Sequence, residues 1–512
     1  MPTSILDLPT ELILEIIHSD NSTDAATIAY LGMTCRRLHG MCQVLVLERQ
    51  LPVLRALASR GRLLIYKDSA SSIAMKDEEL DDVKEIFQAS FHKIEYVPEP
   101  LDLIHEEIAG VHGLISNSNA VGHINIKLDS LPYMYDLGEP GRDWYKLLAS
   151  LIRVASEKDM ASLTIRDRER PYFTTRLRIW LPSSPVENKK STFSLLKDRC
   201  FGHKTRWGGI GTQPNRQVGT PEREKLPNTD VYFGAPRGLT SFEISSPIPF
   251  HGACLPHTLR LLNGGYFTKL SLRSIRLSTA DWYNLCQLLF MPLLSEFDVW
   301  DSNFPFRHLL PFLQRHSSIT HIDLSYSAPK DSPIMLPKDF LPRLEAMSGS
   351  PHHLLFLLSS RRHLFPSLRS VALRTHYPLL AIHGGALDHI MRNLADRKMG
   401  TIHLSIEFSQ SAGLTEYFSK AKSKPRSLNC VNTLEIIRCP AGCPFSSEIC
   451  DGFFFWVSVK FPYVQELYLT QLVPPDPNMW TWKLDALWDS CSRLQSIIVG
   501  VETYQRPVKA VK

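Results

Sequence analysis

The sequence predicts an α/β fold in which a small N-terminal module of three helices precedes an irregular solenoid of alternating strands and helices. Two observations lead to this. Apolar residues recur at helical spacing in the first fifty residues. Further on, strand-like segments of one pattern, apolar-x-x-apolar-x-apolar, keep returning between amphipathic stretches. At 512 residues the chain is long enough for more than one module.

The N-terminal module consists of three predicted helices. The first begins at Pro9, whose missing N–H costs nothing in a first helical turn. Its apolar stripe consists of Leu8, Leu12, Ile13, Ile16 and Ile17. Asp24 can cap a second helix that runs to Leu31, and an apolar third segment follows at residues 33–41. Three helices of this size cannot bury all their apolar faces against one another, so we expect another surface to cover them.

Residues 4–48 carry a more specific pattern, "LDLPTELILEIIHS…DAATIAYLGMTCRRLHGMC". Its features are Leu8-Pro9, Glu11-Leu12-Ile13, Ile16, Leu31 and the closing Thr34-Cys35-Arg36-Arg37-Leu38. In these features the segment resembles an F-box, and the closing run resembles a form common in fungal F-boxes. One departure is "DAATIAY", which stands where the second helix of the family has a leucine-rich start.

The resemblance implies that this module docks on the Skp-type adaptor of a Skp–cullin–F-box ubiquitin ligase. The implied adaptor-binding residues are Leu8, Pro9, Leu12, Ile13, Ile16, Leu31, Cys35 and Leu38. The softer start of the second helix implies a weaker adaptor interface than is typical. The alternative is an ordinary helical hairpin packed on the rest of the chain.

The body of the chain contains eleven strand-like segments of the repeated pattern. They begin at residues 121, 160, 239, 267, 294, 319, 368, 399, 431, 464 and 494. Most successive starts lie near the 20–29-residue period of leucine-rich repeats or slightly above it, so residues 119–505 resemble a degenerate array of that family. In each strand the alternating apolar residues point into a core and the residues that flank them point outward. Helices such as "DWYNLCQLLF" (281–290) and "RHLLPFLQRH" (307–316) would lie between strands, each unit burying its face against its neighbours.

Three features make the array degenerate. The Asn or Cys that normally follows the strand and satisfies turn backbone groups is found only as Cys439. The other equivalent positions are Ser302, Ser327, His376, Glu407 and Glu502. The 79-residue gap between the second and third strands contains "TRLRIWL", a further possible strand. The 49-residue gap after residue 319 holds either an extra repeat without the strand pattern or a long insertion. An α/β domain with a closed parallel sheet is the alternative architecture, although its strands would be longer apolar runs.

Two segments stand outside the repeats. Residues 183–230 contain nine Lys or Arg against five acids, so most of the net charge of +5 lies there. This segment is rich in Pro, Gly, Asn and Thr and has no periodicity, which predicts a mobile basic loop. A solvated insertion is favoured over a functional basic patch. Residues 49–118 are predicted to be a helical linker, because Val83, Ile86, Phe87 and Phe91 have helical spacing.

Composition argues against several classes of protein. No apolar run approaches the ~18 residues that span a bilayer, and the N-terminus lacks the pattern of a secretory signal. The ten cysteines have no paired spacing, which favours reduced thiols and a cytoplasmic or nuclear location. A net charge of +5 gives no strong case for nucleic acid. We therefore expect neither a membrane nor a nucleic-acid partner.

No convincing catalytic or metal-binding motif is present. The cluster Cys430, Cys439, Cys443 and Cys450 includes "CPAGC", a spacing that zinc tolerates, but no CxxC pair or HxxxH accompanies it, so structural thiols are favoured. "WGGIGT" at residue 207 has neither the preceding strand nor the following Lys-Ser/Thr of a phosphate loop. We therefore expect no cofactor, no metal and a non-catalytic protein.

Together these observations predict the substrate-recognition subunit of a ubiquitin ligase, with the F-box on the adaptor, the adaptor on a cullin and the repeats on an unknown protein substrate. The alternative is a repeat-built scaffold that acts outside ubiquitination. The predicted substrate-binding residues are Arg273, Glu296, Asp298, Trp300, Asp323, Arg374 and Tyr468.

We expect the three acids among these residues to form a patch between the two arginines, and the target to present a basic or hydrogen-bonding segment to them. Aromatic and Arg side chains are frequent interface anchors, so Trp300 is expected to receive an apolar group. The alternative is that a neighbouring loop covers Trp300 and that the acids are merely solvated.

Overall fold

The computed structural model describes residues 15, 50–67, 90–98, 104–128, 144–158, 160–167, 238–250, 254–264, 266–302, 304–325, 336–359, 364–374, 384–395, 400–408, 417–418, 427–438, 447–470, 484–485 and 487–507. The chain divides into two compact units, Met1–Phe267 (unit 1) and Thr268–Lys512 (unit 2). The boundary falls inside the segment predicted as one solenoid. Among the described residues, no helix has both the length and the apolar character needed to cross a membrane.

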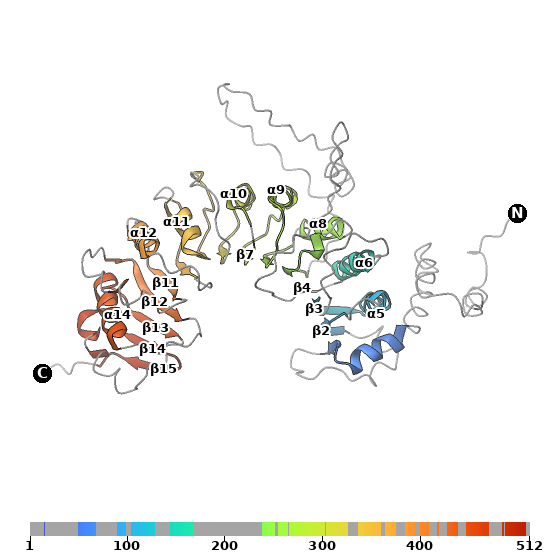
Figure 1. Ribbon diagram of the computed structural model, residues 1–512, viewed down its shortest axis with the longest axis horizontal. Coiled ribbons are helices and arrows are strands. Elements are labelled where there is room, and N and C mark those ends of the chain that lie inside the picture. The colour runs from blue at the N-terminus through green and yellow to red at the C-terminus, as the bar shows by residue number, and fades with distance from the viewer. Residues whose placement is uncertain are drawn as a thin grey trace, which may run out of the picture. The chain divides into compact units, whose positions relative to one another are not determined.

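Unit 1 is a mixed α/β unit. Residues 50–59 are helical, and the elements that follow are β1 (Leu63–Tyr66), β2 (Ser90–Tyr96), α5 (Ile104–Asn117), β3 (Ala120–Lys127), α6 (Trp144–Glu157), β4 (Ser162–Arg166), β5 (Ser241–Ser245), the 3-10 turn Ile248–Phe250 and α8 (Leu255–Leu262). Strand β1 pairs antiparallel with β2, and β2 to β5 are parallel and adjacent in sequence order. Helices α5, α6 and α8 lie on one face of these strands (Figure 1).

Unit 2 repeats the same arrangement over a longer stretch. Its elements are β6 (Lys269–Arg273), α9 (Thr279–Leu288), β7 (Glu296–Trp300), α10 (Phe306–Arg315), β8 (His321–Leu324), β9 (Ala346–Gly349), α11 (Pro351–Ser359), β10 (Ser370–Leu373), α12 (Gly384–Ala395), β11 (Ile402–Phe408), β12 (Val431–Arg438), α14 (Ser447–Lys460), β13 (Glu466–Thr470), β14 (Ser496–Val499) and β15 (Glu502–Gln505). Strands β6 to β14 are parallel in sequence order, and β15 closes the series antiparallel to β14.

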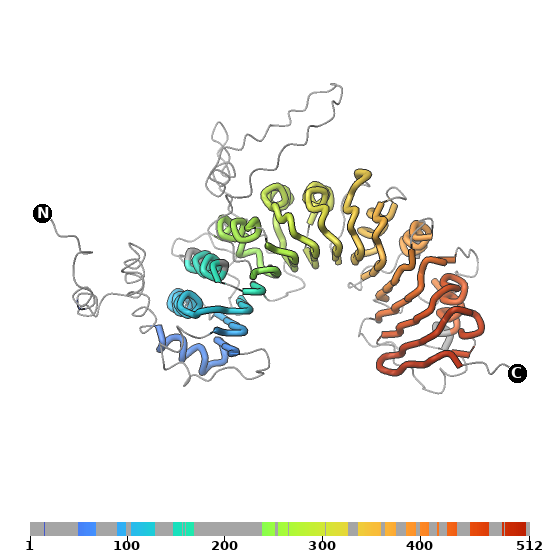
Figure 2. The backbone as a smooth tube through the Cα atoms, turned by 180° about the vertical axis from the view of Figure 1, so that it is seen from behind, coloured from blue at the N-terminus to red at the C-terminus, as the bar shows by residue number. Residues whose placement is uncertain are grey.

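The core of unit 2 lies between the strands and the helices. Burial alternates along β7: Phe297 and Val299 are buried, whereas Glu296, Asp298 and Trp300 are half-buried. The helices supply the opposite layer, as when Phe312 of α10 packs with its ring centroid 5.0 Å from that of Phe297. The described helices of unit 2 therefore cover one sheet face, and the other face carries the residues between the core positions (Figures 1 and 2).

The turns that precede six strands of unit 2 (β7, β8, β9, β10, β13 and β14) share one form. An apolar or buried residue is followed three positions later by another, and the second donates its N–H to the carbonyl of the first. The pairs with their N···O distances are Leu294–Met291 (3.0 Å), Ile319–His316 (3.1 Å), Leu344–Leu341 (3.1 Å), Leu368–Phe365 (3.2 Å), Val464–Phe461 (3.1 Å) and Leu494–Cys491 (3.1 Å). This turn ends each helical layer and fixes where the next strand begins.

The turn after β7 is held by the hydroxyl of Ser302, which occupies one of the positions where the predicted repeat pattern expects Asn or Cys. Ser302 Oγ accepts the N–H of Ile275 from the previous repeat at 3.1 Å, and it lies 3.1 Å from the carbonyl oxygen of Trp300. Ser302 is buried. A serine therefore bridges two turns here, although no asparagine is present.

All eleven predicted strand segments are strands in the structure, and α9 and α10 lie where helices were expected. The 49-residue gap contains an extra strand, β9, followed by α11, which decides between the two alternatives for that gap. The regions 4–48 (apart from helical Glu15), 175–181 and 183–230 lie outside the described residues.

The helical linker predicted for residues 49–118 needs correction. Strands β1 and β2 lie within it and pair with each other, and β2 also pairs with β3. Phe91 has helical spacing with Phe87, but in the structure it sits in β2 opposite Val121. The strand at residue 121, which is the first of the predicted series, is therefore the third strand of unit 1. The pairing of β2 with β3 outweighs the helical spacing of the apolar residues before Phe91.

Candidate binding face

The candidate site is the sheet face of unit 2 that the helices leave uncovered, which we call the open face. Register aligns the middle outward residue of successive strands into one row. This central row consists of Ser271, Asp298, Asp323, Ser348, Ala372, Ser405, Glu435 and Tyr468. Because the strands are in register, neighbouring members of the row stand one strand spacing apart, ~4.8 Å.

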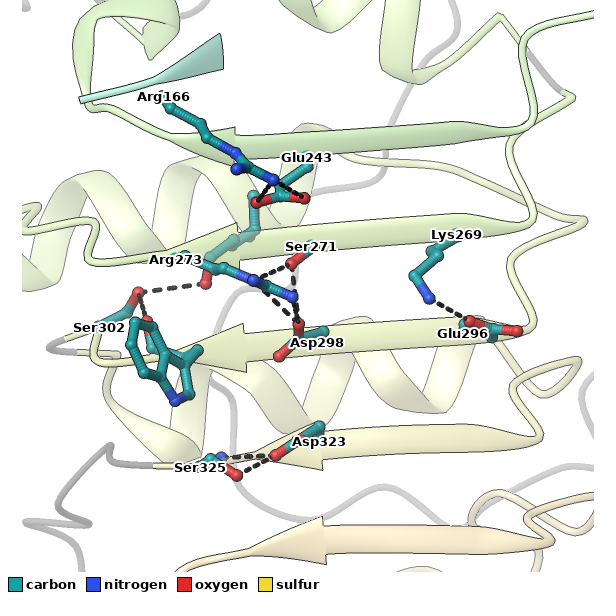
Figure 3. A network of polar contacts seen from close by, with 12 residues as sticks. Arg166, Glu243, Lys269, Ser271, Arg273, Glu296, Asp298, Ser302, Asp323 and Ser325 are labelled. Carbon is teal, nitrogen blue, oxygen red and sulfur yellow. Dashed lines mark hydrogen bonds and ion pairs between the residues drawn. The ribbon is translucent and has the colours of Figure 1, made fainter. Parts of the chain in front are cut away.

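Asp298 on β7 is at the centre of a polar network (Figure 3). The Ser271 hydroxyl donates to its Oδ2 at 2.8 Å, and the Arg273 guanidinium lies 3.1 Å from the same oxygen. Arg273 also donates to Ser271 Oγ at 3.0 Å. Burial and the nearby Asp323 raise the pKa of Asp298 above its usual range, although Ser271 and Arg273 act in the opposite direction. The environment of Asp298 therefore disfavours the charged form of its carboxyl group, although Arg273 forms an ion pair with it.

Asp323 on β8 stands directly beside Asp298 in the register. Its Oδ1 accepts the backbone N–H of Ser325 at 2.9 Å and also the Ser325 hydroxyl. Among the described residues, no lysine or arginine forms an ion pair with Asp323. Ser325, which follows β8, thus orients the Asp323 carboxylate, and no lysine or arginine among the described residues neutralises its charge.

The predicted acidic patch of three residues is corrected to two. Glu296 forms an ion pair with Lys269 on the adjacent strand, with 2.7 Å between Nζ and Oε2 (Figure 3). The two residues face each other in the register, so the pairing follows directly from the strand alignment. Glu296 therefore belongs to an exposed ion pair, and the acidic cluster consists of Asp298 and Asp323.

The other predicted site residues lie at different places on the open face. Trp300 is half-buried at the end of β7 and stands opposite Arg273. Arg374 follows β10, two strands beyond β8, and donates its backbone N–H to Gly349 at 2.9 Å. Tyr468 is on β13, at the far end of the central row, where its hydroxyl donates to Glu466 at 3.2 Å. The structure brings together Arg273, Asp298, Trp300 and Asp323, but neither Arg374 nor Tyr468 joins that cluster.

A second acidic position, Glu435 on β12, was not singled out from the sequence. Thr470 lies 3.5 Å from its Oε1, and His403 Nε2 lies 3.6 Å from its Oε2. Neither neighbour is a permanent cation, and Glu466 on the next strand adds a further carboxylate. The period-2 pattern of "VNTLEI" places Glu435 outward, but only the register shows that it shares a row with Asp323.

Between the two acidic positions the central row is lined by small side chains: Ser348, Ala372 and Ser405. Ser405 is only 3 % exposed, and Ala372 is 9 % exposed. The hydroxyls of Ser348 and Ser405 are both buried and have no hydrogen-bond partner. Buried polar groups are normally paired, so these two hydroxyls are exceptions that call for a physical reason.

Two further predictions from the sequence concern residues outside the open face. All eight adaptor-binding residues predicted from the F-box resemblance, Leu8, Pro9, Leu12, Ile13, Ile16, Leu31, Cys35 and Leu38, lie outside the described residues. Of the four clustered cysteines, Cys439 and Cys443 also lie outside them. Cys430 is half-buried, and burial raises the pKa of its thiol. The described residues contain no group of three or more His, Cys, Asp or Glu arranged to hold a metal ion.

Comparison with known proteins gives no family for this chain. No protein-family model matches the sequence, and a search of curated proteins found no match.

Proposed function

We propose that this chain is the substrate-recognition subunit of a Skp–cullin–F-box ubiquitin ligase. In this proposal residues 4–48 form an F-box that docks on the adaptor, and residues 119–505 form an irregular leucine-rich-repeat solenoid that binds the target for ubiquitination. The protein itself is non-catalytic and acts in the cytoplasm or the nucleus.

The observation that carries the target-binding half is the open face of unit 2. Consecutive strands place one side chain each in a single row from Ser271 to Tyr468, and all of these side chains except Ala372 are polar or aromatic. In repeat proteins the face of the stacked units that is not used for packing can serve as an extended binding surface for a protein partner. The adaptor-binding half is supported by the sequence of residues 4–48 alone.

The adaptor-binding half is tested with the double variant Leu12→Asp and Ile16→Asp. Truncating a central apolar anchor of an interface typically costs about 2 kcal/mol or more, and a charge there costs more. We expect the variant to lose co-purification of the adaptor and cullin while its circular dichroism spectrum keeps the wild-type form. The control Thr10→Asp with His18→Asp adds the same number of acids off the apolar stripe and should retain the adaptor.

The target-binding half is tested with Trp300→Ala combined with Asp323→Ala. This variant should bind the adaptor normally but leave the target undegraded, which proximity labelling followed by abundance proteomics in cells can measure. Tyr283→Ala with Asp339→Ala, two exposed residues away from the strands, is the matched control. Target turnover equal to wild type in the Trp300 and Asp323 variant would place recognition elsewhere.

The scaffold alternative predicts a different outcome. If the wild-type chain captures protein partners through the open face but neither adaptor nor cullin co-purifies, the repeats bind a partner outside ubiquitination. That result would reject the ligase assignment and retain the binding face.

A further inference from the structure

We propose that two copies of this chain associate through the free edge of β15, with the two β15 strands antiparallel about a twofold axis at Tyr504. The strand that occupies this edge is therefore β15 of a second copy. The inference goes beyond the proposed function, because the pairing needs neither the adaptor nor the target.

Strand β15 is the last strand of unit 2, and β14 is the only described strand beside it (Figure 1). Its outer edge is accessible, because Glu502, Thr503 and Gln505 are exposed and Tyr504 is half-buried. Such an edge presents a row of unpaired N–H and C=O groups, which is a template for another strand. Proteins often block an edge with proline, lysine or a bulge, but the residues of β15 include none of these.

The hydrogen bonds to β14 show which backbone groups of β15 face outward. Arg506 follows the strand and donates its N–H to the carbonyl oxygen of Gln495 at 2.9 Å, on the β14 side. In an antiparallel pair the residues alternate between those that bond to the partner strand and those that do not. Thr503 and Gln505 therefore direct their N–H and C=O groups away from β14, to the free edge.

The pairing of β14 with its other neighbour gives the same result independently. Ser496 of β14 stands opposite Gln505 in the register. Its N–H donates at 3.2 Å to the carbonyl oxygen of Gln465, which precedes β13, and so points away from β15. The pair Ser496–Gln505 is therefore a position without backbone hydrogen bonds between β14 and β15. This leaves the N–H and C=O of Gln505 for a strand on the other side.

The direction of these groups restricts how two copies can pair. With Tyr504 opposite Tyr504 of the second copy, Thr503 faces Gln505 of that copy, and the two residues exchange both N–H···O=C hydrogen bonds. The twofold axis repeats this exchange on its other side. A shift by one residue would face each outward group with a residue already bonded to β14. A shift by two would require Val501, which belongs to the turn before β15, or Pro507, which has no N–H.

The charged side chains of the edge complement each other in the same alignment. Glu502 of one copy faces Arg506 of the other on both sides of the axis. Among the described residues neither forms an ion pair. The Glu502 carboxylate accepts the Tyr504 hydroxyl, and the Arg506 guanidinium donates to the carbonyl oxygen of Trp488 at 3.0 Å. Because opposite charges directly across an antiparallel pair stabilise it, the pairing matches two charges that a single chain leaves unmatched.

The twofold axis also brings apolar surface together. The Tyr504 side chains of the two copies meet at a position without backbone hydrogen bonds between them, where side chains lie closest, and aromatic pairs across strands are favourable. Val501, which is 99 % exposed, comes to lie beside Pro507 of the second copy. An edge this short buries less than the ~1,600 Å² of a standard stable complex, so we expect a weak dimer whose fraction rises with protein concentration.

Sedimentation velocity of the full-length chain over a wide range of protein concentration tests the association. We expect a monomer that converts to a dimer as the concentration rises. Growth should stop at the dimer, because a contact between two identical edges closes on itself. A chain that stays monomeric at every concentration would overturn the proposal, and so would species larger than a dimer, which need a contact between different surfaces.

Charge variants test the register. Glu502→Lys places a lysine opposite Arg506 of the second copy on both sides of the axis and should weaken dimerisation by about tenfold or more. Asp339→Lys makes the same change of charge at an exposed residue of the turn before β9 and should leave dimerisation unchanged. Equal effects in the two variants would show that only net charge matters, which contradicts the proposed pairing.

A proline variant tests the backbone hydrogen bonds. Thr503→Pro removes an N–H that points at the free edge, whereas the bonds from β15 to β14 are kept. The circular dichroism spectrum should therefore keep the wild-type form while the dimer is lost. A Thr503→Pro chain that folds and dimerises like the wild type would mean that the contact lies elsewhere.

Cross-linking gives a readout that loss of folding cannot imitate. In Tyr504→Cys the new thiol lies on the axis and meets its own copy, so mild oxidation should form a covalent dimer. In Gln505→Cys the thiol faces Thr503 of the second copy and should not cross-link. The wild-type chain, oxidised in the same way, gives the background from its own cysteines. No cross-link in Tyr504→Cys, or an equal yield in both variants, contradicts the axis at Tyr504.

Discussion

Glu95 in unit 1 and Asp298 in unit 2 are both carboxylates in outward positions of parallel strands, yet their pKa values move in opposite directions. Burial by itself would raise the pKa of Glu95, but hydrogen bonds and charges from Lys127 and Lys93 outweigh it and leave the pKa lowered. Burial and Asp323 raise the pKa of Asp298 in spite of Arg273. The same strand position therefore supports a satisfied ion-pair network in one unit and an unsatisfied acidic cluster in the other.

The two units differ in whether their outward carboxylates have cationic partners. In unit 1, Glu243 is paired with Arg166 at 3.2 Å, and Glu95 contacts two lysines, so the acids described on that face have cations of their own. In unit 2, Asp323 and Glu435 lack a lysine or arginine partner among the described residues. A face with unmatched charge is less suited to stability and better suited to a partner that brings the opposite charge.

The largest expected effect comes from the buried ion pair of unit 1. Glu107 on α5 pairs with Arg62 at 2.9 Å and accepts the Tyr96 hydroxyl at 3.2 Å. Glu107→Gln removes the buried carboxylate that pairs with the part-buried Arg62 guanidinium, which should destabilise unit 1 by about 3–5 kcal/mol in urea unfolding. The control Glu435→Gln should change stability by less than about 1 kcal/mol. Equal losses of unfolding free energy in Glu107→Gln and Glu435→Gln would show that the two units do not differ in how far their carboxylates contribute to stability.

The next effect compares two buried serines of unit 2. Ser302→Ala removes the acceptor of the Ile275 N–H and should cost about 1–3 kcal/mol, because a buried donor is left unsatisfied. Ser405→Ala removes a hydroxyl that has no partner and should cost nothing. Thermal unfolding of the two variants measures the difference directly, and a Ser405→Ala loss as large as that of Ser302→Ala would show that the Ser405 hydroxyl does form a stabilising hydrogen bond.

A smaller effect is the pH dependence contributed by the two carboxylates. The lowered pKa of Glu95 means that its stabilisation is present above the usual Glu value and is lost as pH falls through the folded-state pKa. The raised pKa of Asp298 has the opposite sign, since the folded state binds the proton more tightly and stability falls as pH rises through that pKa. Unfolding from pH 3 to 7 should therefore change slope in opposite directions for Glu95→Gln and Asp298→Asn.

The smallest effect concerns the coupling inside the acidic cluster. Asp323→Asn removes the negative charge next to Asp298 and should lower the pKa of Asp298, which carbon-13 NMR titration of the carboxyl can follow. Asp339→Asn, an exposed acid in the turn before β9, is the control and should leave the titration unchanged. An unshifted Asp298 in the Asp323→Asn variant would mean that the two carboxylates do not interact.

Much of the fold could be predicted because strand periodicity is local. The apolar-x-x-apolar-x-apolar pattern identified eleven strands whose two core positions are both apolar, as in "LSEFDV" of β7. Strand β2 carries the same pattern in "FHKIEY" at residues 91–96, but the helical spacing of the preceding apolar residues obscured it. Both periodicities fit Phe91, and only pairing with β3 decides between them.

The strand pattern did not predict β9, and the reason differs from that for β2. Its second core position is Gly349, where a Cβ atom would lie 3.3 Å from the Leu324 carbonyl oxygen, so a larger side chain would crowd β8. The signal that remained was the turn before it, "LPRL" at 341–344, which matches "FPSL" at 365–368 before β10. Searching for that turn as well as for the strand would have found the repeat.

The candidate site could be predicted only in part. Outward positions follow from period 2, so Arg273, Asp298, Trp300 and Asp323 were placed on one face. The ion pair between Lys269 and Glu296 and the alignment of Glu435 with Asp323 depend on the register between strands that are far apart in sequence. No single-strand pattern contains that information.

The constancy of the register has a consequence for how this protein can change. Paired residues of neighbouring strands are 24 positions apart between β9 and β10, as for Ala346 and Ser370, and 33 apart between β12 and β13, as for Thr433 and Glu466. The extra residues enter between the strands and leave the pairing intact. Insertions there can alter the helical side of the molecule freely, while the intervals at which the open face presents its side chains stay the same.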